Sequence, residues 1–204
     1  MDNEGALKPW NCLVVGVGGQ GVVLASRLVA AACMDGGAFV RTAETIGMSQ
    51  RGGSVASHVR VAASPDDVPS SLIGAAGADL VLSFEPGEAV RSFSQLKPTG
   101  SVVCADRAVV PAAAPGYTGS AQLDWLRAHV PPERIAVVDA SALDEAGLSP
   151  KCLNVMLLGA ALGLHALPFD STRLTVAMEG LMRPKLIPMN VKALELGMKL
   201  ASRR

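Results

Sequence analysis

Short blocks of apolar residues recur along the chain and predict buried β-strands. The first, Cys12–Val17, is rich in valine and uninterrupted, as expected of a parallel strand covered on both faces. Comparable blocks follow at Ala38–Thr42, Ala78–Phe84, Ser101–Ala105 and Ile135–Val138. Ser54–Val61 differs, because its valines alternate with residues that include His58 and Arg60. This period of two predicts a strand with one aliphatic and one polar face.

Longer apolar segments predict helices between and after these strands. The first, Gln20–Met34, is polar only at Ser26 and Arg27, so we expect it to be buried on several sides. A second helix begins at Glu85-Pro86 and continues to about Leu96. Further helices are predicted at Gln122–His129, Cys152–Leu164, Ser171–Leu181 and Asn190–Leu200, with a surface loop at Ala108–Gly119. The last helix carries a predicted apolar stripe of Val191, Leu194, Met198 and Ala201.

Strands that alternate with helices are typical of an α/β fold. We therefore expect a Rossmann-like three-layer sandwich with a mostly parallel sheet and a helical C-terminal part. The length of 204 residues suits a single domain that spans residues 1–204.

Composition adds expectations about partners and compartment. Half of the residues are hydrophobic and only 18% are charged, which favours coverage of some surface by a partner protein. The formal net charge is zero and no basic stripe occurs, which argues against nucleic acid as a ligand. The uncharged run Cys152–Phe169 is interrupted by Asn154, Gly159, Gly163 and Pro168, so it predicts a buried helix and no membrane span.

The four cysteines, Cys12, Cys33, Cys104 and Cys152, are widely separated and lie in apolar runs. Cysteines in such surroundings behave as small hydrophobic residues. Their spacing predicts no iron–sulfur cluster, zinc site or other metal site on this chain. The lack of a disulfide pattern favours a reducing, cytoplasmic location.

A glycine turn follows the first predicted strand. Gly16, Gly18 and Gly21 fit the pattern Gly-x-Gly-x-x-Gly, which allows a tight turn, close approach of a phosphate and close helix–strand packing. The free N–H groups at the start of the next helix favour an anion. The candidate cofactor-binding residues are Gly16, Gly18, Gly19, Gln20 and Gly21. A turn that needs glycine only for its backbone conformation is the alternative.

A second glycine element, Gly47–Ser54, contains Gln50, Arg51, Gly52 and Gly53. The paired glycines allow a nest of N–H groups, and Arg51 could hold a carboxylate or phosphate through two hydrogen bonds. A glycine hinge beside a solvated arginine is the alternative. His58 and Arg60 could extend this patch, although an ordinary structural histidine is the favoured interpretation of His58. Glu44 is either the ribose-binding carboxylate of a dinucleotide site or a charge at a strand end.

Catalytic groups are not evident. The three histidines share no ligand spacing, and no nucleophile motif or paired acidic motif occurs, so we assign no catalytic residue. The sequence predicts that a complete catalytic apparatus is not carried by this chain.

The two glycine elements together resemble the gamma-type subunit of 2-oxoacid:ferredoxin oxidoreductases. The form Gly47–Val55, Gly-Met-Ser-Gln-Arg-Gly-Gly-Ser-Val, resembles the indolepyruvate branch, in which this domain is called the beta subunit. The segments that begin at Asn154 and Asn190 resemble two asparagine-led helices of that family. The resemblance therefore covers nearly the whole chain.

This resemblance implies a heteromeric enzyme that oxidatively decarboxylates an aryl 2-oxoacid to an acyl-CoA and passes the electrons to ferredoxin. It implies a larger alpha subunit that carries thiamine diphosphate, magnesium and the iron–sulfur clusters. On this chain it suggests a coenzyme A (CoA) pyrophosphate at Gly16–Gly21. A site for substrate, CoA or partner is suggested at Gln50, Arg51, Gly52, Gly53 and Asn154. A stand-alone NAD(P)- or flavin-binding oxidoreductase and a non-catalytic scaffold subunit are the two alternatives.

Overall fold

The middle layer of the protein is a six-stranded sheet in the order β2-β3-β1-β4-β5-β6. The computed structural model describes residues 8–47, 52–111 and 113–202. The strands are β1 (Trp10–Val17), β2 (Phe39–Ile46), β3 (Ser54–Ala62), β4 (Ala78–Ser83), β5 (Leu96–Ala105) and β6 (Ile135–Val138). The pairs β1–β4, β4–β5 and β5–β6 are parallel, whereas β3 is antiparallel to both β1 and β2. The prediction of a mostly parallel sheet is confirmed.

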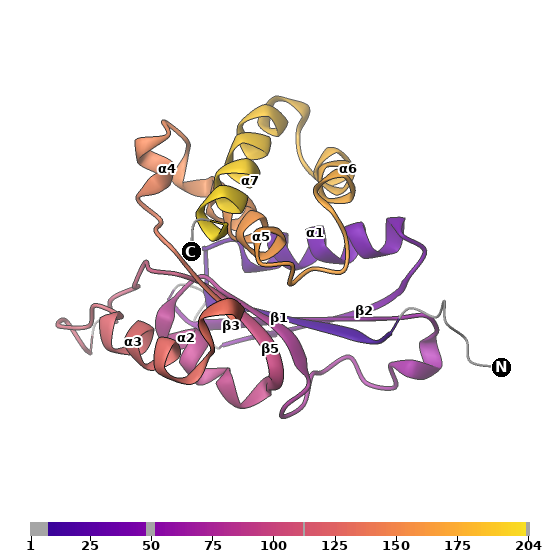
Figure 1. Cartoon of the computed structure of the whole chain (residues 1–204), viewed down its shortest axis with the longest axis horizontal. Helices are drawn as coiled ribbons and strands as arrows, with labels where there is room; N and C mark the ends of the chain where they lie inside the picture. Colours follow the sequence, from indigo (N-terminus) through magenta and orange to yellow (C-terminus); the bar gives the residue numbers. More distant parts are fainter. Residues whose placement is uncertain (1–7, 48–51, 112, 203–204) are drawn as a thin grey trace.

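Helices cover both faces of this sheet (Figure 1). On one face lie α1 (Val22–Asp35), α5 (Leu153–Gly163), α6 (Ser171–Leu181) and α7 (Ile187–Ala201). The other face is covered by α2 (Pro86–Arg91) and α3 (Ser120–His129), and the short α4 (Ala142–Glu145) follows β6. A separate buried cluster fills each interface, so the predicted three-layer sandwich is confirmed. In the described ranges, no helix is both long enough and apolar enough to cross a membrane.

Several boundaries differ from the predicted ones because of pairing with neighbouring segments. β2 extends to Ile46 because it pairs with β3 along its whole length, from Phe39 opposite Ala62 to Ile46 opposite Val55. The second helix ends at Arg91, because a 3₁₀ turn at Phe93–Gln95 redirects the chain into β5. β5 begins before its predicted start and tolerates Pro98, since the register with β4 shifts before the regular ladder.

Helices α5 and α7 pack with their backbones nearly in contact. A Cβ atom added to Gly197 would lie 1.9 Å from the carbonyl oxygen of Met156, and one on Gly159 would lie 2.1 Å from that of Leu194. The buried face of α7 is therefore shifted from the predicted stripe. Leu194 and Ala201 are buried as predicted, but Ala193 and Gly197 replace Val191 and Met198.

The sheet changes winding direction between β1 and β4. From β1 the chain crosses through α1 to β2 on one side, and from β4 it crosses through α2 to β5 on the other side. In open α/β sheets, ligands bind in the crevice outside the carboxyl ends of strands at such a switch point. The fold therefore indicates a candidate site at the carboxyl ends of β1 and β4.

Candidate functional site

Three segments meet at the switch point. The glycine turn follows β1, Glu85 follows β4, and Ser54 begins β3, which starts at this edge because it runs opposite to its neighbours. The Gly18 N–H donates to the Gly53 carbonyl oxygen at 2.9 Å, so the two glycine elements of the sequence are hydrogen-bonded to each other. The structure thus brings together Gly16–Gly21, Gly52 and Gly53.

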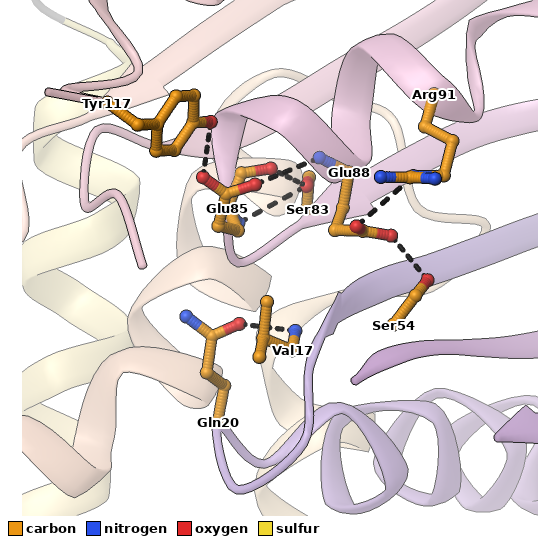
Figure 2. A network of polar contacts seen from close by, with 8 residues as sticks. All are labelled: Val17, Gln20, Ser54, Ser83, Glu85, Glu88, Arg91 and Tyr117. Atoms are coloured by element: carbon orange, nitrogen blue, oxygen red, sulfur yellow. Dashed lines mark hydrogen bonds and ion pairs between the residues drawn. The ribbon is translucent and has the colours of Figure 1, made fainter. Parts of the chain in front are cut away.

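Gln20 fills the inner end of the crevice. Its Oε1 accepts from the Val17 N–H at 2.7 Å, and its Nε2 donates to the Phe84 carbonyl oxygen at 3.2 Å. Figure 2 shows the side chain folded back towards Val17. A Cβ atom on Gly16 would lie 2.8 Å from this Oε1. Gly16 therefore makes room for an internal side chain, and Gln20 links β1 to the end of β4.

The outer side of the glycine turn is open. Gly19 has φ +98°, and no atom of the described residues lies within 4 Å of its Cβ position. Gly21, with φ +93°, is the N-cap of α1 and provides no side-chain cap for the free N–H groups of the first turn. Helix starts of this kind favour an anion.

A basic groove lies beside this open side. Its volume is about 260 Å³, and its lining includes Gly19, Gln20, Arg107 and Lys151. Both cations are exposed, and neither forms an ion pair with a residue in the described part of the chain. We call this hollow the anion groove. It combines free helix N–H groups with two positive side chains, which suits a phosphate or carboxylate.

Asn154 lies against the glycine turn. It is the second residue of α5 and only 4% exposed. A Cβ atom on Gly21 would lie 3.4 Å from its Nδ2. Gln50 and Arg51 lie outside the described residues, so the predicted arginine clamp remains a prediction.

On the α2 side of the crevice, the polar groups are acidic (Figure 2). Glu85 caps α2 by accepting from the Glu88 N–H at 3.0 Å, and its other oxygen accepts from the Tyr117 hydroxyl at 2.5 Å. Glu88 accepts from the Ser54 hydroxyl at 2.5 Å and pairs with Arg91 at 3.3 Å. Burial, together with the hydrogen bond to Glu85, raises the pKa of Tyr117, so its hydroxyl stays protonated and donates.

These carboxylates border a hollow at the switch point, which measures about 830 Å³. Its lining includes Val17, Glu85, Glu88, Val109 and Tyr117. Arg91 lines the same hollow and pairs with Glu88, so the lining keeps a net negative charge, which disfavours a bound anion, whereas the anion groove on the α1 side favours one. The two sides of the glycine turn are therefore electrostatically distinct.

Apart from residues of the two glycine elements, the residues that line the two hollows were not predicted from the sequence. Glu85 carried a usable signal, because an acidic residue before proline at the end of a buried strand is a helix N-cap at the ligand-binding edge of a parallel sheet. Arg107, Tyr117 and Lys151 carried none, since the first two lie in a loop and Lys151 in a 3₁₀ turn that only the tertiary fold brings to the site.

The expected extension of the site through β3 is wrong. His58 is buried, and its Nδ1 accepts from the Ile73 N–H at 3.1 Å, which confirms the favoured structural interpretation. Arg60 donates to Asn11 Oδ1 and to the Ser70 carbonyl oxygen, so it fixes the segment that covers this face. The predicted polar face is therefore a second buried interface.

Glu44 does not lie where a dinucleotide site needs its acidic residue. It is an exposed residue within β2, opposite Ser57. Because β3 separates β2 from β1, its carboxylate is displaced from the glycine turn by the width of a strand. The geometry disfavours the ribose-binding interpretation.

All four cysteines are free and buried, as their apolar surroundings predicted. Burial is the main cause that raises the pKa of each thiol, and the pKa of Cys33 rises to about 12. Among residues 8–47, 52–111 and 113–202, no group of three or more His, Cys, Asp or Glu residues could hold a metal ion.

Comparison with known proteins gives one consistent family. A family model described as pyruvate ferredoxin/flavodoxin oxidoreductase matches residues 11–200. Indolepyruvate oxidoreductase subunit IorB of Archaeoglobus fulgidus is 38% identical over 192 residues, which are 92% of each chain. The protein of the same name from Pyrococcus horikoshii is 33% identical over 96% of this chain and 97% of its own.

Solved structures share the fold. The gamma subunit of a keto/oxoacid ferredoxin oxidoreductase from Geobacter sulfurreducens superposes with a TM-score of 0.65 at 19% identity, over 94% of this chain and 98% of its own. A 2-oxoglutarate:ferredoxin oxidoreductase from Magnetococcus marinus, solved with 2-oxoglutarate, coenzyme A and succinyl-CoA bound, gives 0.67 at 20% identity, over 97% of this chain and 32% of its own. Given the family match across nearly its whole length, the chain belongs to the pyruvate ferredoxin/flavodoxin oxidoreductase family.

Proposed function

We propose that this chain is the subunit without thiamine in a heteromeric 2-oxoacid:ferredoxin oxidoreductase that acts on an aryl 2-oxoacid such as indolepyruvate. The observation that carries the proposal is the similarity, at 31–38% identity over nine-tenths or more of the chain, to proteins named indolepyruvate oxidoreductase subunit IorB. The reaction is the oxidative decarboxylation of the 2-oxoacid to an acyl-CoA, with ferredoxin as the electron acceptor.

The proposed division of labour assigns thiamine diphosphate, magnesium and the iron–sulfur clusters to a larger alpha subunit. Thiamine diphosphate would supply the carbanion chemistry there. On this chain, the anion groove would hold the diphosphate of CoA, through the N–H groups at the start of α1 and the side chains of Arg107 and Lys151. The open space above Gly19 lets a phosphate approach the backbone.

CoA binding to the assembled complex tests the groove. We expect the Arg107→Ala/Lys151→Ala variant to bind CoA about tenfold more weakly, because it loses two charge-assisted contacts. Arg27→Ala is the matched control, since Arg27 is exposed on α1 and does not line the groove. Gly18→Asp, which adds a negative charge to the turn, is expected to weaken binding in the same direction. Unchanged affinity in the double variant and in Gly18→Asp would remove CoA from this groove.

Turnover measurements separate this proposal from a stand-alone nicotinamide or flavin enzyme. Gln20 in the inner crevice and Glu44 on an edge strand both disfavour a dinucleotide. We expect the purified chain alone to oxidise no 2-oxoacid, and the complex with its alpha subunit to reduce ferredoxin in the presence of CoA. Turnover by the lone chain with bound nicotinamide would contradict the proposal. A complex that works with no CoA contact to this chain would favour the scaffold alternative.

A further inference from the structure

A second cavity opens in the helical layer next to the anion groove. Its volume is about 460 Å³, and it lies between the start of α5 and the segment that joins α6 to α7. Leu24, Met182 and Met189 contribute apolar lining. Lys151 lines both this cavity and the anion groove, so the two hollows share a wall. We call it the α-layer cavity; its size is that of an ordinary small-molecule pocket.

Two buried asparagines in its lining have unused hydrogen-bonding groups. Asn154 is 4% exposed and Asn190 is 6% exposed. Asn154 Oδ1 accepts from the Val155 N–H, which leaves Nδ2 without a hydrogen bond to a described residue. Asn190 Nδ2 donates to the Leu186 carbonyl oxygen at 2.8 Å, which leaves Asn190 Oδ1 without a hydrogen bond to a described residue. Neither atom is among the fully buried, unpartnered side-chain atoms of the described residues, so both are accessible to a ligand that offers an acceptor to Nδ2 and a donor to Oδ1.

Positive charge lies at the rim of the cavity. Arg183 and Lys185 are exposed and line it, and neither forms an ion pair within the described part of the chain. Together with Lys151 they provide cations on both sides of an apolar interior. A ligand that fits has an apolar body, an adjacent donor and acceptor, and two separated anionic groups.

Adenosine with a 3′-phosphate has this chemistry. The edge of adenine carries an amino donor next to a ring-nitrogen acceptor, and its flat faces are apolar. We propose that the α-layer cavity receives the adenosine 3′-phosphate end of CoA. The adenine amino group donates to Asn190 Oδ1, a ring nitrogen accepts from Asn154 Nδ2, and the 3′-phosphate lies between Arg183 and Lys185.

This inference rests on the proposed function and defines the orientation in which CoA lies on this chain. The diphosphate occupies the anion groove, the nucleotide end is anchored in the α-layer cavity, and the pantetheine arm extends away from this chain. The thiol is then free to reach an acyl group formed on the partner subunit. A peptide ligand would hydrogen-bond to the two asparagines but would offer no phosphate dianion to Arg183 and Lys185 at the rim.

Titration of the purified complex with CoA and with 3′-dephospho-CoA tests the cavity directly. We expect the wild-type complex to prefer CoA by about tenfold, since the 3′-phosphate adds charge-assisted hydrogen bonds. Arg183→Ala/Lys185→Ala should abolish this preference by weakening CoA alone. Lys192→Ala/Lys199→Ala, with the same loss of charge on exposed positions of α7, is the matched control and should keep the preference. Met189→Trp, which fills the cavity, should weaken both ligands.

Equal affinity of the wild-type complex for the two ligands, or an equal loss of both in Arg183→Ala/Lys185→Ala, would overturn the inference while CoA binding itself stands. Release of the alpha subunit by that variant would identify the cavity as a protein interface and would also overturn it. Failure of the wild-type complex to bind CoA at all would remove the proposed CoA site together with this subsite.

Discussion

The Gln20 side chain hydrogen-bonds to the backbone of Val17 and of Phe84 at the point where a dinucleotide fold receives its ligand. Gln20→Ala would remove the hydrogen bonds to the Val17 N–H and the Phe84 carbonyl oxygen. We expect the free energy of unfolding to fall by roughly 1–3 kcal/mol, measured by urea denaturation. Gln122→Ala is the control, because the Gln122 side chain makes no hydrogen bond to a described residue. Equal stability of the two variants would show that the Gln20 contacts are unimportant.

His58 gives the protein a predictable response to pH. Burial, aided by the nearby Arg60 charge, lowers the pKa of His58 in the folded state. The unfolded chain therefore takes up a proton first, at about pH 6.5. Stability from this group is complete above that pH and is lost as the pH falls towards the folded pKa. We expect the urea midpoint to decrease between pH 7.5 and 5.5, and the decrease to be smaller in His58→Asn, which can still accept from Ile73. An identical pH dependence would contradict this.

The site residues differ in how far sequence could predict them. The glycines and Asn154 belong to recognisable patterns, and the structure brings them together. The role of Gln20 was not predictable, because its position in the pattern is the same whether its side chain faces a ligand or the turn. Arg107 comes from a loop and Lys151 from a 3₁₀ turn; the positions of both depend on long-range packing, so no local pattern marked them.

At the scale of elements, the contact between α5 and α7 depends on glycine. Gly197→Ala would place a methyl group 1.9 Å from the Met156 carbonyl oxygen, so the helices must separate. We expect a loss of roughly 1–3 kcal/mol in the free energy of unfolding. Gly180→Ala in α6 is the control, because its Cβ position is open and alanine favours a helix. A Gly197→Ala protein as stable as Gly180→Ala would disprove the tight contact.

The Tyr117 hydroxyl ties the loop between β5 and α3 to the start of α2. Tyr117→Phe removes the hydrogen bond to Glu85 and leaves the cap of α2 by Glu85 in place. We expect faster cleavage by added protease within residues 108–119, and a stability loss of roughly 1–3 kcal/mol because the acceptor is a carboxylate. Unchanged cleavage kinetics would mean that the loop is held by other contacts.

Element type was easier to predict than element ends. Continuous apolar runs located β1, β4, β5 and β6, because burial on both faces of the sheet requires such runs, and alternation located β3. Long apolar segments located the main helices. The ends of β2, α2 and β5 are set by hairpin pairing, a 3₁₀ turn and a register shift, which arise only between segments. The burial of His58 has the same origin, since a loop covers the face that alternation indicated as polar.

At the scale of the whole molecule, the four thiols report on opening of the fold. Cys12, Cys33, Cys104 and Cys152 belong to the core, and burial raises the pKa of each. Almost no thiolate is then present at neutral pH. We expect an aromatic disulfide reagent to label the native chain only slowly, and all four thiols to react rapidly in guanidinium chloride. Rapid labelling of a native thiol would contradict the assignment of that cysteine to the core.

The reversed direction of β3 has a consequence for how such a chain can diversify. Its register is held by continuous pairing with both β1 and β2, so the sheet does not depend on the length of the link that precedes it. That link begins after Ile46 and reaches the glycine turn through Gly53. Replacements at Gly52 or Gly53 can therefore alter the crevice without moving a strand, which makes this end of the hairpin a place where evolution, or an engineer, can change ligand preference.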